Sequence, residues 1–146
     1  MPVTLEEERR HLVGGAGADA PPAALDVIEV ECEGGAERAL DRVREALAPM
    51  LDHQQGPWPA VDEWKTLLPV WFVDACVDDR QVRDCVLDRW SLRAWLHWLQ
   101  PAERQWRWWD AEVVDASHLR VRLLPLADPY LKGSMNWLLA VAGRPA

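Results

Sequence analysis

Two kinds of hydrophobic repeat occur along this chain, one with a period of two and one with a period of three to four. The first stretch of period two has Ile28, Val30 and Cys32 on one side and glutamates on the other. Successive side chains of a strand point to opposite faces of a sheet. Residues 25–33 therefore predict a half-buried strand with an acidic outer face.

A second alternating region near the C-terminus predicts a β-hairpin. Apolar and polar residues alternate over 108–113 and again over 119–123, and a short polar turn at 115–117 separates the two runs. Two alternating runs joined by a short polar turn are typical of paired antiparallel strands. The sequence therefore adds two antiparallel strands to the first one.

The first and last predicted strands have opposite charges on their outer faces. Glu29 and Glu31 lie on the outer face of the first strand, and Arg120 and Arg122 lie on the outer face of the last. If the two strands pair, the glutamates would face the arginines across the sheet. Exposed pairs of this kind contribute only a few tenths of a kcal/mol, roughly, so they would favour a register without holding the fold.

The period of three to four, which places apolar residues on one side of a helix, predicts several helices. The expected helices cover 36–51, 61–76 with a kink or restart at Pro69, a short segment after Asp78 and Asp79, 92–99 after the N-cap Ser91, and 135–142 after the N-cap Ser134. Proline inside such a pattern removes a backbone hydrogen bond, and serine before it accepts one from the first turn.

These elements predict an α+β fold, in which a small antiparallel sheet of the N-terminal strand and the C-terminal hairpin is packed by several amphipathic helices. Residues 25–146 form the expected single globular domain. Residues 1–24 are expected to be a flexible tail or linker, because the glycine- and proline-rich stretch 14–22 interrupts regular structure after a short helix from Thr4 to Leu12.

Charge and composition limit the classes of partner. The chain of 146 residues has a formal net charge of −8, which opposes nonspecific binding to nucleic acid or to an anionic membrane. The N-terminus lacks a signal peptide, and no apolar run is long enough to span a bilayer, so we expect a cytoplasmic protein. The excess of arginine over lysine, together with many alanines and prolines, indicates a GC-rich and hence bacterial source.

No catalytic or metal-binding motif is evident in the sequence. The candidate groups are the thiols of Cys76 and Cys85 with His97 or His118 as base, and the carboxylate pairs Asp74/Asp78 and Asp84/Asp88. The thiols lie on apolar helical faces, the carboxylates lie near arginines, and the histidines lack metal-site spacing. We therefore expect no catalytic residues, no metal and no cofactor.

Tryptophan is the unusual feature of the composition. The chain has 10 tryptophans, and six of them lie between Trp90 and Trp109. Tryptophan is large and apolar but carries an N–H group that needs a partner, so a cluster indicates either a tryptophan-rich core or an aromatic surface. Trp95 and Trp109 fall on the inward faces of their elements and are expected in the core.

Three other tryptophans fall off those inward faces. Trp98, Trp106 and Trp108, together with the neighbouring carboxylates Asp110 and Glu112, are therefore the predicted interaction surface. Several large apolar rings exposed side by side usually indicate a binding site, because water solvates them poorly.

The leading hypothesis is a noncatalytic cytosolic protein-interaction module, in its concrete form an acidic inhibitor or immunity-type protein that binds a basic partner. One alternative is a small-molecule or carbohydrate-binding domain that uses the same tryptophans, and another is an enzyme with an unrecognised Cys/His or Asp site. An interaction module predicts tryptophans on a flat or convex patch, whereas a ligand-binding domain predicts that they line a cavity.

Overall fold

The computed structural model describes residues 4–77 and 90–145, so the predicted helix after Asp78 and Asp79 lies outside the described residues. Its elements, in chain order, are α1 (Leu5–Gly14), β1 (Asp26–Glu31), α2 (Ala36–Asp52), α3 (Val61–Leu67), α4 (Val70–Ala75), α5 (Leu92–Leu99), β2 (Trp106–Asp115), β3 (His118–Pro125) and α6 (Gly133–Ala142). The three strands form one antiparallel sheet in the order β1-β3-β2. The predicted α+β class is confirmed.

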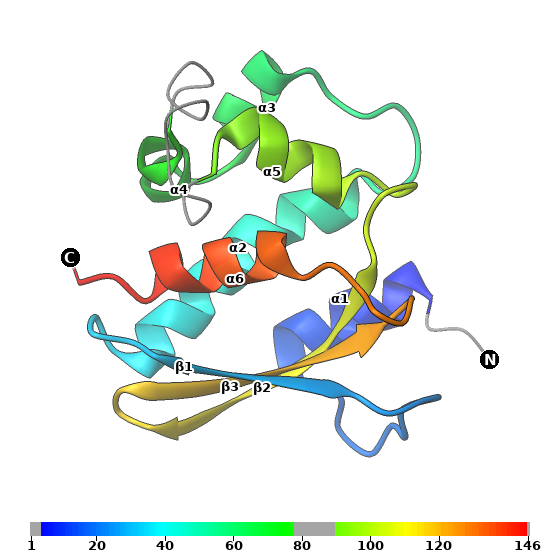
Figure 1. Cartoon of the computed structure of the whole chain (residues 1–146), viewed down its shortest axis with the longest axis vertical. Coiled ribbons are helices and arrows are strands. Elements are labelled where there is room, and N and C mark those ends of the chain that lie inside the picture. Colours follow the sequence, from blue (N-terminus) through cyan, green and yellow to red (C-terminus); the bar gives the residue numbers. More distant parts are fainter. Residues whose placement is uncertain (1–3, 78–89, 146) are drawn as a thin grey trace.

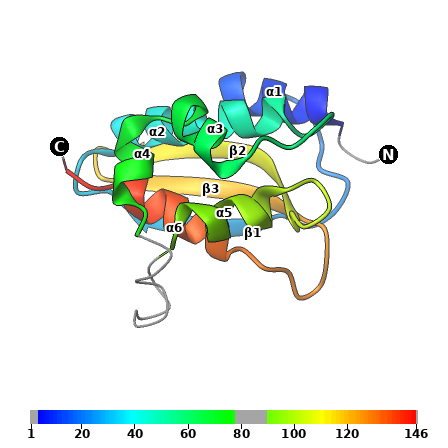
Figure 2. The ribbon, with the colours of Figure 1, turned by 90° about the horizontal axis from the view of Figure 1, so that it is seen from above.

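The helices all lie on one side of the sheet, and the segment between α1 and β1 passes over one end of the other side (Figure 1). Helices α2 and α6 contact each other above the sheet, and α3, α4 and α5 lie farther from it. Figure 2, seen from above, shows α1 beside α2 and α6 beside α5. The core lies between the sheet and these helices, and its largest fully buried side chains are Trp64, Trp95, Trp106, Trp108, Phe72, Leu47 and Met50.

The register of the sheet confirms one of the predicted charge pairs and corrects the other. Glu29 pairs with Arg120, and their side chains form an ion pair at 3.0 Å. Because the strands are antiparallel, Glu31 lies opposite His118 and not opposite Arg122. Arg122 instead forms an ion pair with Asp110 of β2.

Pro69 and Ser91 define helix boundaries as the local sequence predicted, whereas Ser134 does not. Helix α3 ends at Leu67, and α4 begins after Pro69, so the expected restart is confirmed. Helix α5 begins after Ser91, whose Oγ accepts a hydrogen bond from the amide of Ala94 at 3.1 Å. The predicted cap Ser134 is wrong, because α6 begins at Gly133 and Ser134 is buried inside its first turn.

The N-terminal segment is packed over much of the stretch that was expected to be a flexible tail. Helix α1 contacts β2 and α2, and its side chains Glu8, His11 and Leu12 are buried. Ala16 is also buried, in a small second cluster with Trp109 and Leu124. The expectation rested on the glycine- and proline-rich stretch 14–22, whereas α1 is held to the core by the pairing of Glu8 with Arg104 and Arg107.

No helix among the described residues is both long enough and apolar enough to cross a lipid bilayer.

Candidate functional site

Two of the three tryptophans predicted for the surface lie in the core. Trp106 and Trp108 are each only 1% exposed. A β-bulge shifts the register of β2 between Trp108 and Asp110, so the alternation reverses there. Trp106 and Trp108 consequently point to the helical side, and Trp109 packs with Leu124 in the second cluster. The predicted exposure of Trp106 and Trp108 is wrong, although Trp95 and Trp109 are buried as expected.

The predicted carboxylates lie on the face of the sheet opposite to the helices, and arginines neutralise them there. Asp110 accepts a hydrogen bond from Arg122 Nε at 2.6 Å, and Glu112 accepts one from Arg120 Nη1 at 3.2 Å. Helix α5, which carries Trp98, lies on the opposite side of the sheet (Figure 1). The structure therefore does not bring Asp110 and Glu112 together with Trp98.

Trp98 is half-buried and lines a pocket of about 210 Å³. Its walls come from the residue before the cap of α5, from α5 itself, from the connection between α5 and β2, and from the end of the β3–α6 connection with the start of α6. The lining residues are Trp90, Trp98, Glu103, Gln105, Leu131, Gly133 and Ser134. Of the residues that the sequence predicted for a site, Trp98 is the one that the structure places in a cavity.

A glycine allows this pocket to form. A Cβ atom at Gly133 would lie only 2.8 Å from Cζ2 of Trp90, so any larger residue would displace the indole ring. The backbone of Trp90 is fixed by a hydrogen bond from the amide of Val77 to its carbonyl oxygen at 3.0 Å, directly before the cap Ser91. No local pattern marks Trp90 as a pocket wall, because its contact Gly133 lies 43 positions away.

Two of the polar side chains of the pocket form hydrogen bonds within the protein, and the third forms no ion pair with a described residue. Gln105 Oε1 accepts a hydrogen bond from the amide of Leu131 at 2.9 Å, and Ser134 Oγ accepts one from Trp106 Nε1 at 3.3 Å. Glu103 is half-buried and forms no ion pair with any residue that the structure describes. The pocket therefore combines two indoles with one carboxylate that forms no ion pair within the described part of the chain.

A wider groove of about 760 Å³ lies on another side of α5, between that helix and residues 58–65. Trp58, Leu92 and Leu96 provide apolar walls, whereas Lys65 and His97 provide polar ones. Asp62 forms an ion pair with Lys65 at 3.6 Å, and the groove is open to solvent. It has the volume of a small-molecule site but not the enclosure that such sites usually have.

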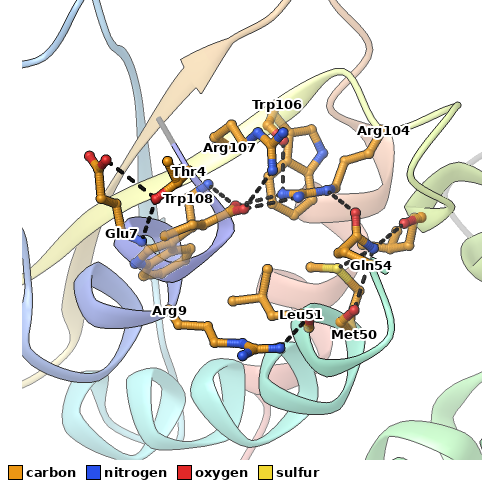
Figure 3. A network of polar contacts seen from close by, with 12 residues as sticks. Thr4, Glu7, Arg9, Met50, Leu51, Gln54, Arg104, Trp106, Arg107 and Trp108 are labelled. Carbon is orange, nitrogen blue, oxygen red and sulfur yellow. Dashed lines mark hydrogen bonds and ion pairs between the residues drawn. The ribbon is translucent and has the colours of Figure 1, made fainter. Parts of the chain in front are cut away.

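A buried ion-pair network joins α1 to β2, and sequence reasoning missed it (Figure 3). The carboxylate of Glu8 accepts hydrogen bonds from Arg104, Arg107 and the backbone amide of Trp108. A signal was available, since Glu8 occupies the inward helical position between Leu5 and Leu12. The two oxygens of the Glu8 carboxylate each accept two hydrogen bonds from the protein itself. We therefore assign a structural role to this network.

The described thiols are not arranged as nucleophiles. Burial raises the pKa of Cys76 to about 11 and also raises the pKa of Cys32. Neither thiol hydrogen-bonds to a histidine among residues 4–77 and 90–145. Cys85 and the pairs that contain Asp78, Asp84 and Asp88 lie outside the described residues. The described thiols thus lack both the lowered pKa and the adjacent base that nucleophilic catalysis requires.

Serine, histidine and aspartate meet in the turn between β2 and β3, but not as a catalytic triad. His118 Nδ1 lies 2.7 Å from Asp115 Oδ1 and 3.1 Å from Ser117 Oγ. A triad needs the serine at the ring nitrogen opposite to the one that the carboxylate holds, whereas both groups here share one nitrogen. The turn is also exposed. These residues therefore stabilise the hairpin turn.

The part of the chain that the structure describes contains no group of three or more His, Cys, Asp or Glu residues that could hold a metal ion.

Comparison of the chain with protein-family models, with curated proteins and with solved structures gives no significant match.

Proposed function

We propose that this chain is a noncatalytic binding protein that holds a small organic group in the pocket between Trp90 and Trp98. The observation that carries the proposal is the place of Trp98, which lines a cavity instead of a flat aromatic patch. Concave, mostly apolar sites with a few polar groups are the usual form of ligand sites in proteins. Of the hypotheses that the sequence left open, the ligand-binding one thus has the better geometric support.

The size of the pocket limits what it holds. Typical small-molecule sites have volumes of about 300–1,000 Å³, whereas this pocket has about 210 Å³. It suits the head group of a larger molecule or one side chain of a partner. Leu131, which is 54% exposed at the pocket, provides apolar surface for the remainder of such a ligand.

The acidic inhibitor hypothesis has less support from the geometry. Its aromatic platform would have included Trp106 and Trp108, which are buried. Its remaining support is the net charge of −8, which favours a basic partner. The cytoplasmic location and the bacterial source likewise remain predictions from composition.

The experiment that tests the proposal is a fragment screen by NMR, read at the indole N–H signals of the assigned tryptophans. Fragments with small cationic, neutral apolar and hydroxylated head groups are expected to shift the signals of Trp90 and Trp98 selectively. The Gly133→Ala variant should abolish these shifts, because its new methyl group displaces Trp90.

The matched control is Gly14→Ala, because a Cβ atom at Gly14 meets no atom within 4 Å. It should retain the fragment shifts of the unmodified chain. The proposal is overturned if no fragment shifts Trp90 or Trp98, or if the shifts persist unchanged in Gly133→Ala.

A further inference from the structure

We propose that the group held between Trp90 and Trp98 is an organic cation, namely a substituted ammonium head group. This inference rests on the proposed function, because it assigns a ligand class to the same pocket. Its basis is the combination of two indole walls with the carboxylate of Glu103.

The aromatic walls favour a positive charge. The face of an indole ring carries negative electrostatic potential, and of the aromatic side chains tryptophan attracts cations most strongly. Trp90 and Trp98 both line the pocket, and Leu131 adds apolar surface that suits the methyl groups of an alkylated ammonium ion. An alkylated ammonium ion is also weakly hydrated, so its transfer from water to an apolar site costs less free energy than that of a compact primary ammonium ion.

The charge of the pocket also favours a cationic ligand. Among the described residues that line the pocket, Glu103 is the one ionisable side chain, and none is a lysine, arginine or histidine. Within the described ranges Glu103 also lacks an ion-pair partner, so its carboxylate is available to a ligand in the pocket. An anionic ligand would be repelled by this carboxylate, whereas a cation would be attracted.

The hydrogen bonds of the pocket argue against a sugar. A sugar presents many hydroxyl groups, and a site that binds it needs several free donors and acceptors. Here the side-chain oxygens of Gln105 and Ser134 each already accept a hydrogen bond, from Leu131 and from Trp106. Only the amide nitrogen of Gln105, the hydroxyl proton of Ser134 and the carboxylate of Glu103 remain, which is few for a sugar. The carbohydrate alternative therefore has weaker support in this pocket than the cation.

The test compares choline with 3,3-dimethylbutan-1-ol, in which a carbon atom replaces the charged nitrogen. Both are titrated at constant ionic strength, and binding is read at the indole signals of Trp90 and Trp98. We expect choline to bind about tenfold more tightly than the neutral alcohol, in line with the strength of a desolvated cation–π contact.

Variants isolate the role of the carboxylate. Glu103→Gln should weaken choline binding several-fold, which is the effect expected from the loss of one partly exposed charge contact. Binding of the neutral alcohol should stay unchanged. Glu63→Gln, at an exposed position of α3, is the matched control and should change neither affinity.

The outcomes separate the two proposals. If choline and the alcohol bind equally and Glu103→Gln has no effect, the cation inference is overturned while the binding function stands. If neither compound shifts Trp90 or Trp98, and the wider fragment screen also fails, both proposals are overturned.

Discussion

Glu8 and Arg104 form a two-hydrogen-bond ion pair inside the protein, although 96 positions separate them in the chain. Arg104 Nη1 lies 2.5 Å from one carboxylate oxygen of Glu8, and Nη2 lies 2.9 Å from the other. Both side chains are almost completely shielded from solvent. The remaining donors of Arg104 reach the carbonyl oxygen of Trp106 and the side chain of Gln54. Helix α1 is thereby attached to the first residues of β2.

Removal of this carboxylate is expected to destabilise the fold strongly. In Glu8→Ala the guanidinium of Arg104 stays buried without its partner, which costs about 3–5 kcal/mol of unfolding free energy. The exposed neighbour Glu6 provides the control, and Glu6→Ala should change the stability by less than about 0.5 kcal/mol. Urea denaturation followed by circular dichroism measures both. Equal stability of the two variants would show that the ion pair contributes nothing.

Ser134 is expected to stabilise the core through the indole of Trp106. In Ser134→Ala the Nε1–H group of Trp106 loses the hydroxyl that accepts its hydrogen bond, which costs about 1–3 kcal/mol. The same substitution in a Trp106→Phe background should cost less, because no indole N–H group remains to be left unpaired. Chemical denaturation of the four chains of this cycle gives the coupling. If Ser134→Ala lowers the free energy of unfolding equally in both backgrounds, the hydrogen bond from Trp106 does not contribute to stability.

The thiol of Cys76 is expected to react slowly at neutral pH. Burial raises its pKa to about 11, so almost none of the reactive thiolate is present at pH 7.5. Alkylation by iodoacetamide should be slow in the folded Cys85→Ser variant and should accelerate on unfolding in urea. Peptide mass spectrometry separates Cys76 from Cys32, whose pKa is also raised by burial. Rapid labelling of Cys76 in the folded protein at pH 7.5 would refute this prediction.

The pair of His118 and Asp115 is expected to make the stability of the hairpin depend on pH. The hydrogen bond that His118 donates to the carboxylate of Asp115 raises the pKa of His118 in the folded state. The pKa of Asp115 is lowered by the hydrogen bonds that it accepts from the amide of Ser117 and from His118. The contribution of His118 to folding stability is complete below its unfolded pKa of about 6.5, and it is lost as the pH rises through its higher folded pKa. The contribution of Asp115 to folding stability is complete above its unfolded pKa of about 4, and it is lost as the pH falls through its lower folded pKa.

The Asp115→Asn variant tests this pH dependence. Its His118 ring should titrate by NMR close to the ordinary value near 6.5, below the value in the unmodified chain. The stability difference between the two chains should be greatest between about pH 4 and 6.5 and should narrow at higher pH. A His118 pKa that is the same in both chains would contradict the role of Asp115.

Local signals explain why much of the fold was predictable. The cap Ser91, the break at Pro69 and the bounds of α5 depend on residues within one or two helical turns, so the sequence contains the whole cause. The three strands and the pairing of β2 with β3 also followed from the alternation of apolar and polar residues, whereas the place of β1 beside β3 was considered only as a condition for the charge pairs.

The errors occur where tertiary contacts outweigh a local pattern. The alternation in β2 predicted Trp106 and Trp108 on the surface, but the bulge that reverses the two faces has no local marker such as glycine. The acidic pattern of α1 concealed Glu8, whose partners Arg104 and Arg107 lie in a different part of the chain.

The candidate site was accessible to sequence reasoning only in part. Trp98 stood out because it falls off the buried face of α5. Trp90, Glu103 and Gly133 belong to segments that the fold brings together, and periodicity describes one segment at a time. Pocket walls of this kind follow from the tertiary arrangement.

The bulge in β2 has a consequence for how this chain tolerates insertions and deletions. Trp109 is the extra residue of the bulge, because Trp108 pairs with Leu123 and Asp110 pairs with the adjacent Arg122. Deletion of Trp109 would therefore leave Trp106 and Trp108 facing the helices and would remove only the indole that packs with Ala16 and Leu124. Deletion of Arg107 would instead turn Trp106 to the outer face, so the effect of a single-codon deletion in β2 depends on which side of one residue it falls.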